Sequence, residues 1–391
     1  MPEAYIVSAR RTAGGRRNGR LAAWHPADLG AAVLDALVAD IGLDPAAIDD
    51  VIIGCVSQIG EQTFALGRNV VLASKLPDSV PAVTIDRQCG SSQQALHFAA
   101  QAVMSGMQDI VIAGGVESMT RVPMGSPITL AKAGGIGANP FAESIQKRYG
   151  VEGFNQFVGA QMIADKYGFS REDHDRFALQ SHQKAAAATA AGAFAAEIVP
   201  LAVVTPDGQT VTHDRDEGIR GDASLESIGS VKLLSESGTL SAATASQICD
   251  GASGVLVASE AAVKAHGLTP IARIVNLAVT AGDPVIMLEE PIPATRRVLE
   301  RAGLSMADID LFEVNEAFAS IPMAWAKALG ADPAKLNVNG GAIALGHPLG
   351  ATGTKLMATL IHALKARGGR YGLQTMCEGG GIANASIIEV L

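Results

Sequence analysis

The chain has 391 residues, a formal net charge of -9, 48% hydrophobic residues and 4% aromatic residues. Because a single hydrophobic core stops growing near roughly 250–300 residues, this length predicts two or more domains. The acidic balance argues against a nucleic-acid partner or an anionic membrane, and the scarcity of aromatic residues argues against stacking platforms for bases.

The N-terminal sequence and the cysteines bear on the compartment. Residues 1–7 contain no basic leader followed by an apolar stretch, and no apolar run reaches the ~18–20 residues of a membrane span. The cysteines, Cys55, Cys89, Cys249 and Cys377, are far apart and predict neither a disulfide scaffold nor a zinc cluster. We therefore expect a cytoplasmic protein with reduced thiols and no metal site.

Strand-like apolar runs alternate with alanine-rich helical stretches. In chain order the pattern predicts a helix at Pro26–Ala39, a strand at Val51–Ile53, a strand at Val80–Ile85, a helix at Gln93–Met104 and a strand at Ile110–Ala113. This alternation favours parallel α/β layers.

A different kind of sequence follows, from about Val122 to Ala245. It includes an alanine-rich helix at Gln183–Ala191 and a polar stretch at Thr205–Ser230. We interpret it as a long, partly helical insertion that covers one end of the first half. Long excursions of this kind are usually lids or binding elements.

A weak internal repeat links the two ends of the chain. Gly42–Asp49 resembles Gly303–Asp310, an offset of 303 − 42 = 261 residues, and each copy runs into an apolar strand. Later in the second half, the strand Gly372–Met376 leads into the turn Cys377–Gly381. The corresponding segment of the first half is Ala113–Glu117. Chance similarity could explain the first match alone, but the order of the matches favours two duplicated α/β halves.

Cys89 lies between a predicted strand and a predicted helix, in Asp86-Arg87-Gln88-Cys89-Gly90-Ser91-Ser92-Gln93-Gln94. A thiol at a helix N-terminus feels the positive end of the helix dipole, which favours the nucleophilic thiolate. A buried, inert cysteine is the alternative. The position between strand and helix favours the nucleophile.

His347 lies in a glycine-dense segment, Asn337-Val338-Asn339-Gly340-Gly341-Ala342-Ile343-Ala344-Leu345-Gly346-His347-Pro348-Leu349-Gly350-Ala351-Thr352-Gly353. Glycine turns can hold the backbone while the imidazole projects, so His347 could deprotonate a thiol and then donate to an oxyanion. The alternative is a phosphate-binding loop, but the segment matches neither a P-loop nor a dinucleotide fingerprint.

Two further segments carry candidate residues. In Met376-Cys377-Glu378-Gly379-Gly380-Gly381, a cysteine at a strand end precedes glycines whose N–H groups can face an oxyanion. Taken alone, Cys377 fits an inert turn thiol better. In Glu313-Val314-Asn315-Glu316-Ala317-Phe318, Asn315 could cap a helix or orient a water, and spacing does not decide between them.

Taken together, these four segments resemble the thiolase family, in its order and over nearly the full length. The resemblance implies a thiolase fold, in which two duplicated βαβαβαββ halves form a layered αβαβα body with an inserted loop domain. It implies residues 1–121 plus 246–270 as one half, 122–245 as the loop domain over the coenzyme A (CoA) site, and 271–391 as the other half.

The resemblance also implies the chemistry, an acyltransferase that cleaves or forms 3-ketoacyl-CoA by a ping-pong reaction through acyl-Cys89. His347 activates Cys89, Cys377 is the acid/base at the substrate α-carbon, and Asn315 positions a water that forms one oxyanion hole with His347. The N–H groups of Cys89 and Gly379 form the second. CoA is a substrate, and no cofactor is bound tightly.

The resemblance places Arg220 near the adenine–phosphate end of CoA and Ser246 near its pantetheine arm, although a solvated charge explains Arg220 equally well. Family members are usually homodimers or homotetramers. Departures such as Cys89-Gly90-Ser91-Ser92, Thr244-Ala245-Ser246-Gln247 and Ile382 put the shape of the acyl pocket in doubt. The Cys89 and Cys377 segments look like those of thiolases assigned to steroid breakdown, and the expected direction is degradative.

Two rival interpretations stay open at this point. One is a ketoacyl-synthase-like condensing enzyme, which typically pairs one cysteine with two histidines, or with a histidine and an asparagine. The other is a non-catalytic acyl-CoA or lipid-binding protein, which would not require Cys89, His347 and Cys377 together.

Overall fold

The computed structural model describes residues 2–137, 139–205 and 207–391, so Ala138 and Pro206 of the predicted insertion lie outside the described residues. The first half contains β1 (Ala4–Thr12), β2 (Gly15–Arg16), α1 (Pro26–Ile41), β3 (Asp50–Gly54), α2 (Leu66–Ala73), β4 (Ala82–Ile85), α3 (Ser91–Met104), β5 (Ile110–Ser118) and β9 (Cys249–Ser259). The second half contains β10 (Ala272–Ala281), α10 (Pro291–Ala302), β11 (Leu311–Val314), α11 (Ser320–Leu329), α12 (Ala342–Leu345), α13 (Thr352–Arg367), β12 (Tyr371–Glu378) and β13 (Ile382–Val390). Helix α9 (Glu260–His266) joins the two halves.

The strands form one continuous sheet in the order β4-β3-β5-β9-β1-β10-β13-β12-β11. The halves meet where β1 and β10 pair antiparallel, through Tyr5 with Arg273 and Ile6 with Ala272. The predicted parallel arrangement holds only toward the outer edges, where β3 pairs with β4 and β5, and β11 with β12. It is wrong for the centre, since β9 and β13 are antiparallel to both of their neighbours.

The predicted duplication is confirmed. Helices α1 and α10 end at Gly42 and Gly303, which have φ angles of 61° and 66°, left-handed values that favour glycine. A short 3-10 turn then leads into β3 in one half and β11 in the other. Helices α3 and α13 begin at Ser91 and Thr352, again 352 − 91 = 261 residues apart.

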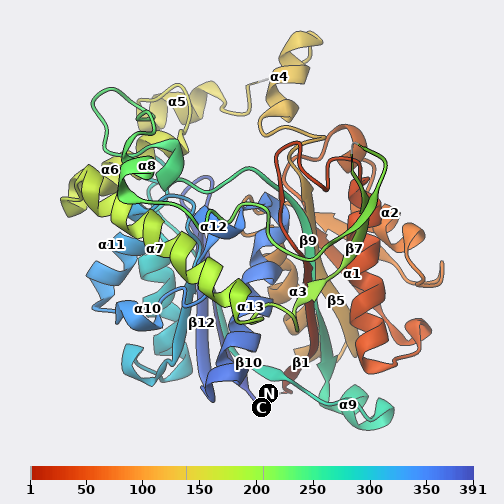
Figure 1. Ribbon diagram of the computed structural model, residues 1–391. Helices are drawn as coiled ribbons and strands as arrows, with labels where there is room; N and C mark the ends of the chain where they lie inside the picture. Colours follow the sequence, from red (N-terminus) through yellow and green to blue (C-terminus); the bar gives the residue numbers. More distant parts are fainter. Residues whose placement is uncertain (1, 138, 206) are drawn as a thin grey trace.

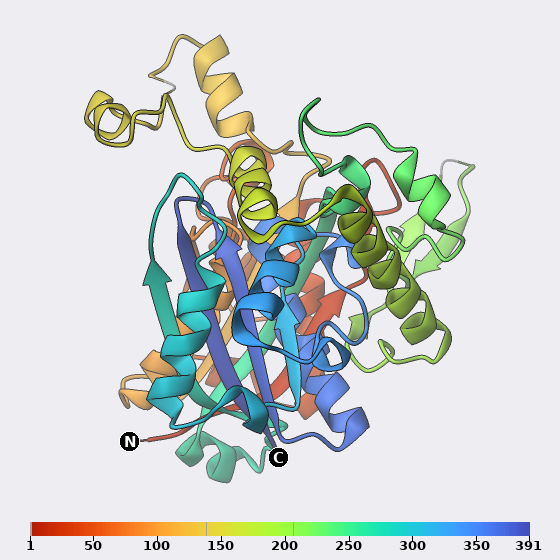
Figure 2. The ribbon, with the colours of Figure 1, turned by 90° about the vertical axis from the view of Figure 1, so that its left-hand side faces the viewer.

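Figure 2 shows the helices and sheets of the body in layers. The apolar face of each strand determines which helices pack against it. On the first half-sheet, Val51 and Ile53 pack toward α1 and α2, while Ile52 joins a second cluster with residues of α3 and α13. The second half-sheet packs its outer face against α10 and α11. Helices α3 and α13 therefore form a central layer between two half-sheets, as the expected αβαβα body requires.

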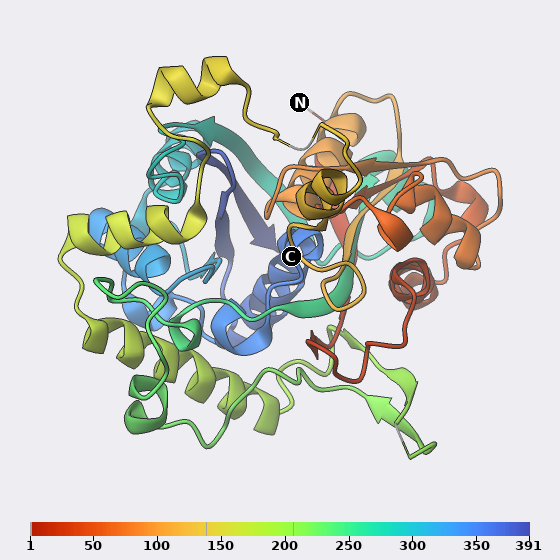
Figure 3. The same ribbon diagram turned by 90° about the horizontal axis from the view of Figure 1, so that it is seen from above.

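Most of the insertion lies at one end of this body (Figures 1 and 2), and the view from above shows its elements spread around the two halves (Figure 3). Its elements are α4 (Ser126–Ala133), α5 (Glu143–Tyr149), α6 (Gln156–Tyr167), α7 (Arg171–Ala190), β6 (Ile198–Val199), β7 (Leu201–Val204), β8 (Thr210–His213) and α8 (Leu225–Gly229). Helix α7 crosses the front of the molecule, and both chain termini lie at the opposite end from the insertion (Figure 1). The boundaries proposed for the three parts stay predictions. Within the described ranges, no helix has both the length and the apolar character needed to cross a bilayer.

Candidate active site

Cys89 occupies a constrained turn between β4 and α3. The residue before it, Gln88, has a φ of 48°, which is a strained left-handed conformation for a residue with a side chain. The residue after it, Gly90, cannot carry a Cβ because that atom would collide with the Glu378 carboxyl group. The turn thus holds Cys89 at the N-terminus of α3, where it keeps partial contact with solvent.

The expectation that this position favours the thiolate is wrong for the resting protein. Desolvation by the surrounding protein, followed by the nearby Cys377 and Glu378, raises the pKa of Cys89 well above its ordinary value. Helix α3 begins two residues beyond Cys89, at Ser91. Cys89 is therefore a thiol at neutral pH, and it needs a base to become a nucleophile.

Cys377 lies at the end of β12 and packs in a fully buried apolar cluster that includes Leu240, Leu288 and Phe318. Burial, with a smaller contribution from Glu378, raises the pKa of this thiol to about 12. The turn that follows β12 touches the turn that precedes α3, since a Cβ on Gly379 would lie 3.0 Å from Gln88 Oε1. The structure therefore brings the Cys89 and Cys377 segments together.

Glu378 is a residue of the site that the sequence motifs did not single out. Its carboxyl group is buried, and neither oxygen has a hydrogen-bond partner among the described residues. Burial raises its pKa to about 8 against the lowering effect of Arg87, so the group is mostly protonated at neutral pH. A carboxylic acid beside two thiols leaves them without an adjacent full negative charge.

The duplicated position in the first half is Glu117, 378 − 117 = 261 residues earlier. Glu117 accepts hydrogen bonds from Val56 N, Ser57 N, Gln62 Nε2 and Gly350 N, at 2.9–3.0 Å. The repeat could have singled out Glu378 from the sequence, but only the structure shows that it lacks such donors.

His347 is held in one tautomer by its neighbours. The Thr352 hydroxyl donates its only hydrogen to Pro348 O at 2.9 Å, so at 2.6 Å it accepts from His347 Nδ1. The proton of the neutral ring therefore lies on Nδ1, and Nε2 carries the free lone pair. Asn315 Nδ2 lies 3.5 Å from Nε2, a long contact in which the amide is the donor.

The charge state of the His347 imidazole agrees with a role as a base. Burial, with a smaller contribution from the Lys355 ammonium, lowers the pKa of His347 to about 3. The imidazole is therefore uncharged at neutral pH. The N-termini of α3 and α13 abut, since Thr354 N donates to Ser92 Oγ at 3.1 Å, which brings the His347 loop beside the Cys89 turn.

Asn315 follows β11, and its N–H donates to Thr375 O of β12 at 3.2 Å. The alternative of a helix cap does not hold, because α11 begins at Ser320 with Ala319 at the cap. Asn315 Oδ1 is buried and has no partner in the described part of the chain. The amide can therefore accept from a small polar molecule beside His347.

The two residues expected at CoA lie farther out. Ser246 borders the Asn315 segment, since its N–H donates to Ala317 O at 3.0 Å. The Arg220 side chain is exposed on the insertion, and its main-chain N–H donates to His182 Nδ1 at 3.2 Å. Gln247 Nε2 donates to Gly218 O at 2.8 Å, which ties the two segments together.

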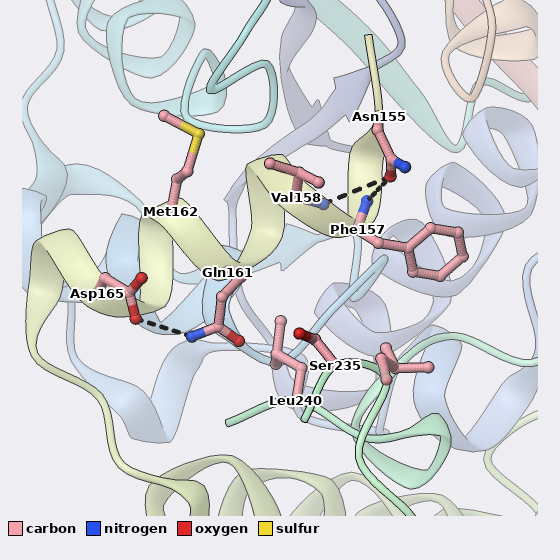
Figure 4. Close-up of a pocket in the computed structure, with 9 residues that line it drawn as sticks. Asn155, Phe157, Val158, Gln161, Met162, Asp165, Ser235 and Leu240 are labelled. Atoms are coloured by element: carbon pink, nitrogen blue, oxygen red, sulfur yellow. Dashed lines mark hydrogen bonds between the residues drawn. The ribbon is translucent and has the colours of Figure 1, made fainter. Parts of the chain in front are cut away.

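A pocket of about 580 Å³ opens between α6 and residues 234–240 of the insertion (Figure 4). Its lining residues are Asn155, Phe157, Val158, Gln161, Met162, Asp165, Leu234, Ser235 and Leu240. It borders the Cys377 cluster, because Leu240 belongs to both and the Phe157 ring packs edge-on against Phe318 at 5.5 Å.

Comparisons with known proteins agree with this geometry. Residues 4–261 match the model of the thiolase N-terminal domain, and residues 268–390 match that of the thiolase C-terminal domain. The chain is 53% identical to the steroid 3-ketoacyl-CoA thiolase FadA6 of Mycobacterium tuberculosis, over 100% of this chain and 95% of that protein. It is 41% identical to a 3-ketoacyl-CoA thiolase of Bacillus subtilis, over 100% of both chains.

A solved structure gives the same result. The crystal structure of human mitochondrial 3-ketoacyl-CoA thiolase superposes with a TM-score of 0.89 and 36% identity, covering 100% of this chain and 99% of that one. The matches span both halves and the insertion, so they concern the whole fold. The chain therefore belongs to the thiolase family and is an acyltransferase.

Proposed function

We propose that the chain cleaves 3-ketoacyl-CoA in a ping-pong reaction, with Cys89 as nucleophile, His347 as its base and Cys377 as the acid/base at the α-carbon. The observation that carries the proposal is the contact between the Cys89 and Cys377 turns, with the His347 loop beside them and the His347 Nδ1 held by Thr352. The second cysteine distinguishes this chemistry from that of a ketoacyl synthase.

In the degradative direction, His347 Nε2 takes the Cys89 proton while Sγ attacks the 3-keto carbonyl. The bond between the α-carbon and the carbonyl carbon then breaks, and Cys377 protonates the carbanion, which releases acetyl-CoA. A second CoA takes the acyl group from Cys89. The N–H groups of Cys89 and Gly379 would hold one oxyanion, and His347 with a water on Asn315 the other.

We propose that the α6 pocket takes the apolar part of the acyl-CoA, with Ser246 and Arg220 along the CoA and the insertion as its cover. Its volume falls in the ordinary range for small-molecule sites, and Phe157, Val158, Met162 and Leu240 give it apolar walls. The similarity to a steroid thiolase supports a bulky, ring-bearing acyl group rather than a short one.

A thiolysis panel from acetoacetyl-CoA to ring-bearing 3-ketoacyl-CoA tests this substrate class. Val158→Trp should lower kcat/KM for the ring-bearing substrates by about tenfold or more, equal to about 1.4 kcal/mol, and spare acetoacetyl-CoA. Val204→Trp, on the exposed strand β7, is the matched control. Equal losses for small and large substrates would place the acyl group elsewhere.

We also propose a homo-oligomer that forms through β4. This strand lies at the edge of the sheet, and its Val83 is 44% exposed, so it offers unpaired backbone groups and apolar surface to a second copy. Equilibrium sedimentation should give at least twice the mass of one chain, and Val83→Lys should shift it toward a single chain. Val204→Lys is the control, and a single-chain mass for the unmodified protein at micromolar concentration would exclude the proposal.

A cytoplasmic location completes the proposal, because Cys89 and Cys377 must both stay reduced to act. Fractionation of cells that express the chain checks it.

A further inference from the structure

A buried network of four charged side chains lies behind His347. Arg11 of β1 holds Glu197 (Nε to Oε1, 2.6 Å) and Asp216 (Nη1 to Oδ1, 2.8 Å), and Lys355 of α13 approaches Asp216 Oδ1 at 3.8 Å. None of these side chains is more than 4% exposed. The two cations and two anions balance, as buried charges must. Glu197 and Asp216 come from the insertion, so the network joins it to both halves.

Lys355 extends this network to the catalytic loop. Its Nζ donates to Leu345 O at 2.6 Å and to Gly346 O at 3.2 Å, the carbonyl groups of the two residues before His347. The backbone at Gly346 packs closely against Cys249, because a Cβ on Gly346 would lie 2.6 Å from Cys249 Sγ. This close packing restricts the loop. The His347 N–H donates to Gln247 O at 3.0 Å. Lys355 is the cation that holds this loop, while the acidic side chains Glu117 and Glu316 accept from its N–H groups at Gly350 and Ile343.

The His347 imidazole and the Lys355 ammonium each face a small set of charged groups. Lys355 is the charged group that acts on the imidazole, whose other partners, Asn315 and Thr352, are neutral. Burial lowers the pKa of Lys355 itself, with a smaller lowering from Arg11, while Asp216, the Cys249 thiol and Glu197 favour its charged form. A cation behind the ring opposes a second proton on it.

We propose that Lys355 is a positioning residue for the reaction proposed above. Its hydrogen bonds to Leu345 O and Gly346 O hold His347 in place, and its charge keeps the imidazole in its proton-accepting form. When acyl-CoA acylates Cys89, the Cys89 S–H bond breaks and an N–H bond forms at Nε2. The new C–S bond replaces the bond to CoA sulfur, which receives the proton from Nε2. A proton that stayed on the ring would stop this transfer, and the Lys355 ammonium disfavours that state.

Three substitutions separate the two roles. Lys355→Arg keeps donors and charge, Lys355→Gln keeps a donor without charge, and Lys355→Met keeps neither. Lys335→Met is the matched control, since Lys335 Nζ donates to another backbone carbonyl, Ile309 O, at 2.7 Å, away from His347. The measurement is the rate of acetylation of Cys89 by acetyl-CoA at each pH, read from intact mass after quenching.

We expect the acid midpoint of this rate to rise in Lys355→Gln and Lys355→Met, because the ring gains a proton more easily without the cation; burial, the larger cause of the low pKa of His347, remains in both variants. Lys355→Arg and Lys335→Met should keep the midpoint of the unmodified enzyme. At neutral pH, Lys355→Gln should be faster than Lys355→Met.

An unchanged midpoint in Lys355→Gln would overturn the electrostatic role, and equal neutral rates in Lys355→Gln and Lys355→Met would overturn the positioning role. If Lys355→Met does not fold, the comparison of Lys355→Gln with Lys355→Arg still decides the effect of charge. An unmodified protein that forms no adduct at Cys89 would refute the proposed function itself, and this inference with it.

Discussion

Cys89→Ala is expected to abolish acyl transfer, with a loss on the order of 10⁴-fold or more, as for other enzymes stripped of their nucleophile. The half-reactions share the acyl-Cys89 intermediate, so cleavage, synthesis and exchange should all stop together. Intact mass measured after incubation with acetyl-CoA or acetoacetyl-CoA should show one acetyl group on the unmodified chain and none on the variant.

Cys55→Ala is the matched control for this substitution. It removes the same atoms from a buried thiol in the core of the first half, and it should cost stability without removing the adduct. An acetyl group that persists on Cys89→Ala protein, or that maps to another residue of the unmodified chain, would contradict the mechanism.

Cys377→Ala should separate the two kinds of chemistry. Acylation of Cys89 requires His347 but no proton at the α-carbon, so it should fall by less than about tenfold. Formation and cleavage of the carbon–carbon bond should fall by about 10²–10⁴-fold, the usual contribution of a general acid or base. Exchange of the α-protons of acetyl-CoA with deuterated water should be lost in parallel.

The control for Cys377→Ala is a measurement of its stability. The thiol packs against Leu288 and Phe318, so its removal leaves a small cavity, and thermal unfolding should show a modest loss of stability. If acylation and carbon–carbon chemistry fell equally in a folded variant, Cys377 would have no separate role.

Much of the fold could be predicted from the sequence, because local patterns encode it. The repeat of Gly42–Asp49 at Gly303–Asp310 marks two helix ends, and both helices end there in left-handed glycines. The direction of the central strands could not be predicted in this way. Hydrophobic periodicity identifies a strand but not its partner, and β9 finds its place only after the long insertion.

The candidate site, too, could be predicted from the sequence only in part. Motifs singled out Cys89, His347, Cys377 and Asn315, which the structure places on neighbouring segments. The protonation states could not be read from the sequence, because they depend on burial by residues far away in the chain. The thiolate expected at Cys89 was wrong for this reason, and the roles of Glu378 and Lys355 depend on neighbours that no spacing reveals.

The position of β9 also constrains how the chain folds during synthesis. This strand pairs with β1 on one side and β5 on the other, and all of its residues are buried. Until Ser259 has left the ribosome, β1 and β5 have no partner at those edges, and unpaired apolar strands favour aggregation. The sheet of the N-terminal half is therefore completed only when synthesis has passed the insertion, shortly before the C-terminal half begins.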